Sequence, residues 1–295
     1  MSYTFCTISS FSHLYKSFTL ADSLAPWGGH LNILLVDGKT DVGQVPKNVS
    51  FFTLDQLDGE LTKKIIEKYK KESDILRWSL KSVFLLFLLE KNEQAIYVDN
   101  DIHFFGDFRF LFEELAKHPI LLTAHNYPRD PEKNQNWLEA NFRVGLYNAG
   151  FLACNKKAQS TLLWWAKACL YRCEKNYWRG LFDDQKYLDL FPVIEPQTKV
   201  LTHLGCNVAE WNSELCYKTE IEGKFFINQK YPLIFYHFNF YSLKILGRNH
   251  PLFSSYFEAL KEHKKDLQIN NLIPKENKLD YLKLRIWKIL NWWNG

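Results

Sequence analysis

Several common sequence signals are missing from this chain of 295 residues. None of its six cysteines forms a Cys-x-x-Cys pair, and their spacing matches no zinc-binding pattern, so we expect free thiols in a reducing compartment. The N-terminus lacks the basic and apolar regions of a signal peptide. No apolar run is long enough to span a membrane. These absences predict a cytoplasmic protein, and association with the inner face of the cytoplasmic membrane stays open.

The chain also has little excess charge. Its formal net charge is +4, whereas a nucleic-acid-binding domain would show a concentrated basic stripe. We therefore expect no nucleic-acid partner. The mild positive charge fits a small anionic substrate or an anionic membrane surface. Aromatic residues, by contrast, are abundant at 16% of the chain, which suits a large core and also stacking surfaces.

The first third of the chain alternates short apolar runs with longer segments of helical periodicity. This alternation predicts a mostly parallel sheet with helices on both faces. In such sheets, ligands bind beyond the carboxyl ends of the strands. The predicted strands are 3–8, 31–36, 49–54 and 95–98, and the predicted helices are 13–24, 59–72 and 75–89.

The second half is less regular. Residues 125–145 are polar and contain two prolines, which predicts a long loop of the kind that is usually functional or mobile. We find no internal repeat, low-complexity segment or linker, and residues 1–270 are therefore expected to form a single domain. The other predicted elements are strands over 119–123 and 147–154, a helix over 156–175 and an apolar, aromatic run over 233–240.

Two carboxylates directly follow the predicted strand 95–98. Asp99 and Asp101 are spaced i, i+2, and in an extended chain such residues point to the same side. Oxygen ligands suit Mg²⁺ or Mn²⁺, and such an ion readily bridges a substrate diphosphate. An isolated Asp-x-Asp is common by chance, but this one lies at the carboxyl end of a strand, where ligands bind. The pair suggests chemistry on a nucleotide or sugar diphosphate.

Six blocks of the sequence resemble GT-A glycosyltransferases, in that family's order and over about residues 3–245. The closest likeness is to bacterial enzymes similar to glycosyltransferase family 8, which build lipopolysaccharide, O-antigen or capsule. The resemblance implies an α/β fold with a Rossmann-like, mostly parallel sheet flanked by helices. The blocks are Thr4–Ser10, Leu76–Asp101 with its leucine-rich helix, Tyr147–Leu152 with Asn-Ala-Gly, Phe182–Tyr187 with Asp-Gln, Gly205–Asn212, and Tyr236–Phe240 with His-Phe.

The family likeness also implies a reaction and the residues that perform it. A sugar would move, with retention of configuration, from a nucleotide-diphosphate sugar, expected to be a UDP-sugar, to a glycan or lipid-linked acceptor. Asp99, Asp101 and His237 would hold Mn²⁺ or Mg²⁺. Asp184 and Gln185 would contact the donor sugar near its anomeric carbon, with no general base assigned. The other donor-site residues that the likeness implies are Thr7, Ile8, Ser9, Lys81, Val98, Asn100, Asn148, Ala149 and Gly150.

Each of these residues also has a simpler structural interpretation. His237 alone would more often be a hydrogen-bonded core histidine, and the carboxylates at 183 and 184 could cap a helix. Lys81 could be a solvated lysine, but its helix is otherwise almost wholly apolar, so its charge needs a partner or an exit. Arg77 competes with Lys81 for the role of a cation at the diphosphate.

One block departs from the family pattern. Phe240 stands where a glycine is usual, and the lysine that follows, Lys244, comes one residue late. Lys244, Arg248 or neither could supply the cation. This departure is the one support for a degenerate, non-catalytic sugar-binding subunit. A nucleotidyltransferase of the same fold is a further alternative, but the loop after the first strand lacks the Gly-rich, basic sequence expected of one. A haloacid dehalogenase-type phosphatase is another, but its Asp-x-Asp normally follows the first strand, whereas several elements precede the pair here.

The C-terminal residues 271–295 combine helical apolar spacing with basic and tryptophan residues. This pattern predicts an amphipathic helix that lies at a membrane interface. The alternative is a helix that docks on the catalytic domain or on a second copy in a homo-oligomer. Its tryptophans are Trp287, Trp292 and Trp293. The helical pattern begins at Lys278, and its basic residues are Lys278, Lys283, Arg285 and Lys288.

Overall fold

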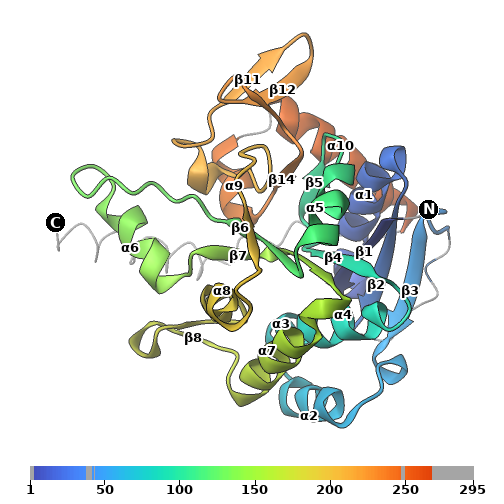
Figure 1. Cartoon of the computed structure of the whole chain (residues 1–295). Coiled ribbons are helices and arrows are strands. Elements are labelled where there is room, and N and C mark those ends of the chain that lie inside the picture. The colour runs from blue at the N-terminus through green and yellow to red at the C-terminus, as the bar shows by residue number, and fades with distance from the viewer. Residues whose placement is uncertain (1–2, 38–41, 43, 247–249, 268–295) are drawn as a thin grey trace.

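The computed structural model describes residues 3–37, 42, 44–246 and 250–267, and the predicted boundary at residue 270 with the tail 271–295 lies outside them. Figure 1 shows a central twisted sheet with helices packed on both faces. The helices are α1 (Leu14–Leu24), α2 (Glu60–Tyr69), α3 (Ser73–Ser79), α4 (Lys81–Leu89), α5 (Arg109–Lys117), α6 (Gln135–Arg143), α7 (Gln159–Tyr171), α8 (Phe191–Ile194), α9 (Phe240–Leu246) and α10 (Pro251–Asp266).

The central sheet has seven strands in the order β10-β6-β7-β4-β1-β2-β3. Strand β7 runs antiparallel to both of its neighbours, whereas the other pairs are parallel. The prediction of a mostly parallel α/β sheet is therefore confirmed. The strands are β1 (Tyr3–Ser9), β2 (Gly29–Leu35), β3 (Val49–Thr53), β4 (Gln94–Val98), β6 (Ile120–Ala124), β7 (Tyr147–Asn155) and β10 (Lys199–Leu201).

Short strands outside this sheet pair with one another. β5 and β14 pair antiparallel and lie just beyond the carboxyl end of β4. Strands β8 and β9 form a two-stranded hairpin, and β11, β12 and β13 form a three-stranded meander, both outside the central sheet. These strands are β5 (Ile102–Phe104), β14 (Phe235–His237), β8 (Lys175–Asn176), β9 (Leu181–Phe182), β11 (Lys218–Ile221), β12 (Lys224–Ile227) and β13 (Tyr231–Pro232).

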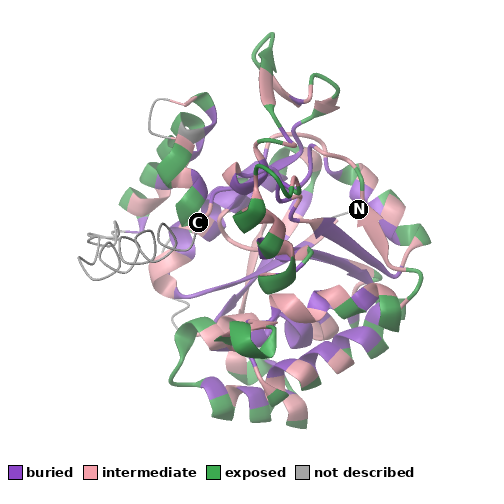
Figure 2. Ribbon diagram, turned by 90° about the vertical axis from the view of Figure 1, so that its left-hand side faces the viewer, coloured by how far each residue is buried: buried purple, intermediate pink, exposed green. Residues whose placement is uncertain are grey.

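Two hydrophobic clusters flank the sheet, because successive strand residues point to opposite faces. In β1, Phe5 joins the cluster under α1, α5 and α10, while Cys6 joins the cluster under α4 and α7. In β4, Ile96 and Tyr97 divide in the same way. Figure 2 shows the strands as buried and the helices as buried only on their inward sides. Burial on both faces explains why these strands read as continuous apolar runs.

The predicted strands of the central sheet agree with the structure within about two residues, a normal difference between methods of assigning ends. The single helix predicted over 75–89 is wrong, because the chain breaks at Leu80 into α3 and α4. Ser79 Oγ donates to Leu76 O at 3.0 Å, a local bond of the type that competes with helix continuation. The break places Lys81 at the start of α4.

The predicted loop over 125–145 is also partly wrong, since it contains α6. Asp130 Oδ1 accepts from the main-chain N–H groups of Glu132 and Lys133 and so fixes the turn before the helix. Trp137 and Val144 then pack against a small third hydrophobic cluster. A short helix with a narrow apolar stripe gives a weak periodic signal, and the prolines before it hid that signal. The 233–240 run likewise divides between β14 and α9.

Candidate active site at the carboxyl end of β4

The two carboxylates lie in a turn, not in an extended chain. Ile102 N donates to Asp99 O at 3.1 Å, which closes a turn directly after the middle strand of the sheet. Asp99 N donates to Gly150 O on β7 at 2.8 Å and anchors the start of the turn. The extended i, i+2 geometry expected for the pair is therefore wrong. Chain reversal, rather than strand alternation, sets the relative positions of Asp99 and Asp101.

His237 joins these carboxylates from a distant part of the sequence. β14 pairs with β5 so that His237 lies opposite Ile102, and Phe238 N donates to Asp101 O at 2.7 Å. His237 Nε2 lies 3.0 Å from Asp101 Oδ1. One ligand atom from each of Asp99, Asp101 and His237 falls within 4.8 Å of the others. Two carboxylates and an imidazole form a donor set that fits Mn²⁺ and, through the carboxylates, Mg²⁺.

Burial and charge act in opposite directions on this pair. Burial alone would raise the pKa of Asp101, but the nearby His237 holds that pKa well below its usual range. Burial alone would lower the pKa of His237, and the carboxylate of Asp101 instead raises it. Each group thus favours the charged form of the other.

The second ring nitrogen of His237 is held by Asn148. Asn148 Nδ2 lies 3.1 Å from His237 Nδ1, within hydrogen-bond distance, and donates to Asn207 Oδ1 at 2.9 Å. Asn148 Oδ1 accepts from Gly150 N at 2.7 Å. This buried network fixes the orientation of the imidazole, as outer-shell hydrogen bonds do for metal-binding histidines.

Gly150 has a steric reason to be glycine. A Cβ at this position would lie 2.6 Å from His237 Cε1, 2.9 Å from Asn148 Oδ1 and 3.0 Å from Asp99 Oδ2. All three contacts are too short for a carbon atom. The close approach of β7 to the carboxylates therefore requires a residue without a side chain.

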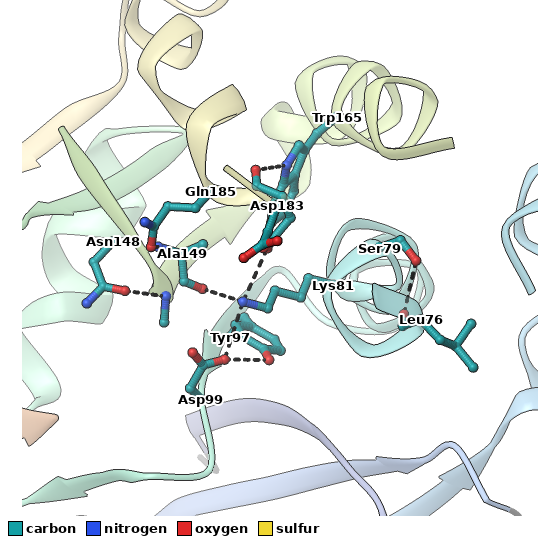
Figure 3. A network of polar contacts seen from close by, with 12 residues as sticks. Leu76, Ser79, Lys81, Tyr97, Asp99, Asn148, Ala149, Trp165, Asp183 and Gln185 are labelled. Carbon is teal, nitrogen blue, oxygen red and sulfur yellow. Dashed lines mark hydrogen bonds and ion pairs between the residues drawn. The ribbon is translucent and has the colours of Figure 1, made fainter. Parts of the chain in front are cut away.

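Lys81 links the carboxylate cluster to a second acidic residue (Figure 3). Its Nζ lies 3.3 Å from Asp99 Oδ1 and 3.2 Å from Asp184 Oδ2, and it donates to Ala149 O at 3.0 Å. The Lys81 residue is only 2% exposed. Burial alone would lower the pKa of Lys81, but Asp184 and Asp99 raise it. The solvated-lysine interpretation is therefore wrong, and the charge has partners as the apolar helix required.

Tyr97 completes the surroundings of this lysine. The Nζ of Lys81 lies 4.9 Å from the centroid of the Tyr97 ring, and the Tyr97 hydroxyl donates to Asp99 Oδ1 at 2.8 Å. The aromatic face adds a favourable electrostatic contact for the buried cation. Lys81 and Tyr97 together hold one oxygen of Asp99.

Asp184 and Gln185 approach from the segment between β9 and α8. Burial raises the pKa of Asp184 to about 6, although Lys81 opposes that shift. The Asp184 side chain makes no helix-capping hydrogen bond, so the capping interpretation does not hold for it. Gln185 Oε1 accepts from Ala149 N at 3.2 Å, and its Nε2 donates to Val144 O at 3.2 Å. Asp183, which precedes them, is buried with a φ of 50°, a strained conformation of the kind that clusters at functional sites.

The expected nucleotide-pocket residues surround the same edge of the sheet. Thr7 and Ser9 end β1 and are buried, and Asn100 Nδ2 donates to Ser9 Oγ at 3.4 Å. The side chains of Ile8 and Val98 belong to the two hydrophobic clusters. The side chains of these two residues therefore do not line a binding site, and only their main-chain groups are left to contact a ligand.

Sequence reasoning missed several polar residues near the carboxylates. Lys16 on α1 acts with His237 against burial to lower the pKa of Asp101. Burial, reinforced by Lys16 and Arg77, lowers the pKa of His13 to about 4. Arg77, which the sequence offered as an alternative to Lys81, pairs with Asp74. Nothing in the spacing of His13 and Lys16 marks them, since only packing beside the turn brings them near it.

Asn207 and Asn212 belong to one of the family-like blocks, but the sequence predicted no role for either. Asn207 is buried with a φ of 59°, and its Oδ1 accepts the hydrogen bond from Asn148 Nδ2. Asn212 Nδ2 donates to Asn207 O at 2.9 Å and to His125 O at 3.0 Å. Among the cation candidates after His237, Lys244 lies exposed on α9, and Arg248 is outside the described residues.

A large cavity of the described chain lies elsewhere. It has a volume of about 590 Å³ and is lined partly by Tyr3, Arg109 and His203. Tyr3 begins β1, so this cavity opens at the amino ends of the parallel strands, opposite the carboxylates. The chemistry of the side chains, rather than cavity size, identifies the candidate site, because ligands of such sheets bind at the carboxyl ends.

Comparison with known proteins identifies relatives of this chain. No protein-family model matches the sequence. The uncharacterised protein YfnF of Bacillus subtilis (strain 168) is 28% identical over 255 residues, which cover 82% of this chain and 83% of YfnF. YfnD of the same organism, also uncharacterised, is 31% identical over 256 residues, which cover 82% of this chain and 79% of YfnD. The chain belongs to the YfnD family.

Solved structures show which fold the YfnD family member described above adopts. Mouse xyloside xylosyltransferase 1 superposes with a TM-score of 0.52 at 15% identity, over 82% of this chain and 99% of that enzyme. The galactosyltransferase LgtC, in complex with donor and acceptor sugar analogues, gives 0.52 at 12% identity, over 92% and 98% of the two chains. The expected GT-A glycosyltransferase fold is therefore confirmed.

Proposed function

We propose that this protein is a metal-dependent glycosyltransferase that takes its sugar from a UDP-sugar. The observation that carries the proposal is the convergence of Asp99, Asp101 and His237 at the carboxyl end of the middle strand. Lys81, Asp184 and Gln185 adjoin this cluster, as a donor-sugar site requires. The GT-A fold supports the same proposal, because here it carries residues that can perform the chemistry.

Charge governs the proposed reaction. The bond from the anomeric carbon to the diphosphate breaks, a bond to the acceptor hydroxyl oxygen forms, and UDP and the hydroxyl proton leave. Mn²⁺ or Mg²⁺ held by Asp99, Asp101 and His237 would neutralise charge that grows on the diphosphate. Thr7, Ser9 and the main chain of the other β1 and β4 end residues would bind the nucleoside.

The remaining residues act on the sugar and on one another. Lys81 holds Asp99 and Asp184 at fixed positions, so we assign it to positioning these carboxylates and to the electrostatics of the donor sugar. Asp184 and Gln185 would hydrogen-bond the donor sugar beside Ala149 and Gly150. A glutamine-to-glutamate active-site mutant is described for LgtC, and Gln185 is our candidate for a comparable role in a retaining transfer.

The proposed acceptor is a glycan or a lipid-linked sugar in the synthesis of a bacterial surface polysaccharide or lipopolysaccharide. In the described part of the chain, no helix is both long and apolar enough to cross a membrane. We propose peripheral contact through residues 271–295, at the inner face of the membrane. The other role that we propose for residues 271–295 is contact with a second copy of the chain in a homo-oligomer.

Calorimetric titration with UDP tests the proposal. Wild-type protein should bind UDP in the presence of Mn²⁺ and lose at least about tenfold in affinity, or about 1.4 kcal/mol, without the metal. Asp101→Asn keeps the shape of the side chain but removes a charged ligand, so it should lose the same factor and most of its response to Mn²⁺. Asp107→Asn, an exposed carboxylate of the Asp107–Arg109 ion pair, is the matched control and should bind as the wild type does.

Binding of UDP that is indifferent to both Mn²⁺ and Asp101→Asn would contradict the metal site. The absence of any UDP binding would contradict the donor assignment. A screen of UDP-sugars for slow release of UDP would then name the donor, since hydrolysis can proceed without an acceptor.

A further inference from the structure

A ladder of aromatic rings leads away from the candidate metal site. The ring of His237 meets Trp211 edge-on, with ring centroids 5.2 Å apart, and Trp211 meets His125 at 6.0 Å. From His125 through Tyr127 to Trp137 the rings stack face to face. This aromatic ladder consists of six residues, His237, Trp211, His125, Tyr127, Trp137 and Tyr241.

The outer half of the aromatic ladder is well stacked. His125 and Tyr127 lie 4.7 Å apart with an angle of 9° between their planes, and Tyr127 and Trp137 lie 5.3 Å apart at 21°. Tyr241 on α9 meets Trp137 on α6 edge-on at 5.8 Å. The ladder therefore ends where α6 and α9 approach each other.

The inner rings are held rigidly. His125 O accepts from Trp211 Nε1 and from Asn212 Nδ2, both at 3.0 Å. His125 Nδ1 donates to Gly145 O at 2.9 Å, and Gln185 lies beside the same ring. The ladder thus touches both His237 and Gln185, the two ends of the proposed reaction centre.

Burial changes along the ladder. His125, Tyr127 and Trp211 are buried, Trp137 is half-buried, and Tyr241 is 42% exposed. The inner rings form a hydrophobic cluster separate from the two that flank the sheet. Core packing accounts for these inner rings, but it does not account for a rigid stack that ends in a half-open tryptophan and an exposed tyrosine.

Polar groups lie beside the open end. Asn134 directly precedes α6, three residues before Trp137, and its Nδ2 donates to Glu214 Oε2 at 2.8 Å. An aromatic face beside a few hydrogen-bonding groups is the usual make-up of a small-molecule site. A pyranose ring has an apolar face of C–H groups, which suits the negative face of an aromatic ring, and hydroxyls around its edge.

We propose that Trp137 and Tyr241 form the acceptor subsite, where a pyranose ring of the acceptor glycan packs against them. The inference rests on the proposed transferase function, because it places the acceptor next to the donor site. The ladder fixes the height of this platform relative to His237 and Gln185.

Saturation-transfer NMR with methyl glycosides of glucose, galactose and N-acetylglucosamine tests the subsite. The full-length protein is saturated with UDP and Mg²⁺, which is not paramagnetic, and is also measured without them. At least one pyranoside should bind the wild type. Trp137→Ala should weaken that binding about tenfold, which is the size of one aromatic contact, and Trp137→Phe should restore most of it. Tyr241→Ala should weaken it in the same direction.

Trp178→Ala is the matched control. Trp178 is fully exposed on the β8–β9 hairpin and is not part of the ladder, so this variant should bind the pyranoside as the wild type does. Calorimetry on the same samples reports UDP affinity, which Trp137→Ala should leave unchanged. Equal pyranoside binding by wild type and Trp137→Ala, or no pyranoside binding by a wild type that binds UDP, would overturn the subsite. A wild type that fails to bind UDP would instead defeat the donor assignment.

Discussion

At the scale of single residues, the site depends on buried charges that neutralise one another. Lys81 lies between Asp99 and Asp184, and removal of Lys81 would leave two carboxylates without the buried cation that they share. His237 and Asp101 form the second such pair. The sequence identified all five residues, but it could not reveal that Lys81 is enclosed, because burial depends on β7 and the Asp184 segment closing over α4.

His125 makes a prediction about acid stability. It is 4% exposed, and burial lowers its pKa to about 3. The unfolded chain therefore takes up a proton at His125 near pH 6.5 while the folded chain does not, so stability falls as pH falls from about 6.5 toward 3. Between about pH 6.5 and pH 5, this residue should cost about 2 kcal/mol of unfolding free energy.

Urea unfolding at a series of pH values measures this effect. His125→Asn should be less stable than the wild type at neutral pH, because the bond to Gly145 O and the ring stack are lost. It should nevertheless lose about 2 kcal/mol less than the wild type over the same acid range. Parallel pH profiles for the two proteins would show that His125 does not remain neutral in the fold.

At the scale of elements, the reversed strand β7 organises the site. Because β7 runs antiparallel to β4, its first residues, rather than its last, border the carboxyl end of β4. Asn148, Ala149 and Gly150 thus contact His237, Lys81 and Asp99 respectively. The sequence predicted β7 as a strand, but strand direction is set by pairing, which apolar periodicity does not encode.

Gly150→Ala tests this arrangement. β7 is paired on both sides, so it cannot shift to relieve the contacts that a Cβ would make with His237 and Asp99. The ligands should be pushed apart, and Mn²⁺-dependent UDP affinity should fall at least about tenfold, or about 1.4 kcal/mol. Calorimetry measures the affinity, and circular dichroism checks that the fold is retained.

Ala153→Gly is the control on the same strand. Ala153 is buried in the cluster on one face of the sheet, away from the carboxylates. This variant should lower stability by about 1 kcal/mol and keep the response of UDP binding to Mn²⁺. Retention of full Mn²⁺-dependent affinity by Gly150→Ala would show that the close approach of β7 is not needed.

At the scale of the whole molecule, the chain joins one sheet to peripheral segments that complete the site. β14 and the 207–212 segment come from the last third of the described chain, and they supply His237 and its supporting asparagines. Exposed apolar side chains gather in the sequence around α6, α8 and the β8–β9 hairpin, including Phe142, Val193 and Trp178.

Vesicle flotation tests the proposed role of residues 271–295. Wild-type protein should float with anionic vesicles and detach as salt is added, because basic side chains are attracted to anionic headgroups and tryptophans to the interface. Replacement of Trp287, Trp292 and Trp293 by serine in the full-length chain should abolish most of the flotation. Replacement of Trp178 by serine serves as the control for loss of one exposed tryptophan. Equal flotation of wild type and the triple variant would contradict membrane contact through this segment.

The sequence by itself determined six of the seven strands of the central sheet, several of the helices that connect them and the carboxylates that follow β4. Local periodicity and residue type suffice for these, because each depends on neighbouring residues. Only the tertiary structure decided that a turn orients Asp99 and Asp101, that His237 meets them, and that Lys81 is enclosed. It also decided that an aromatic ladder runs from this centre to α6 and α9. These features join residues far apart in the chain, and their contacts follow from strand order and packing, which no local pattern specifies.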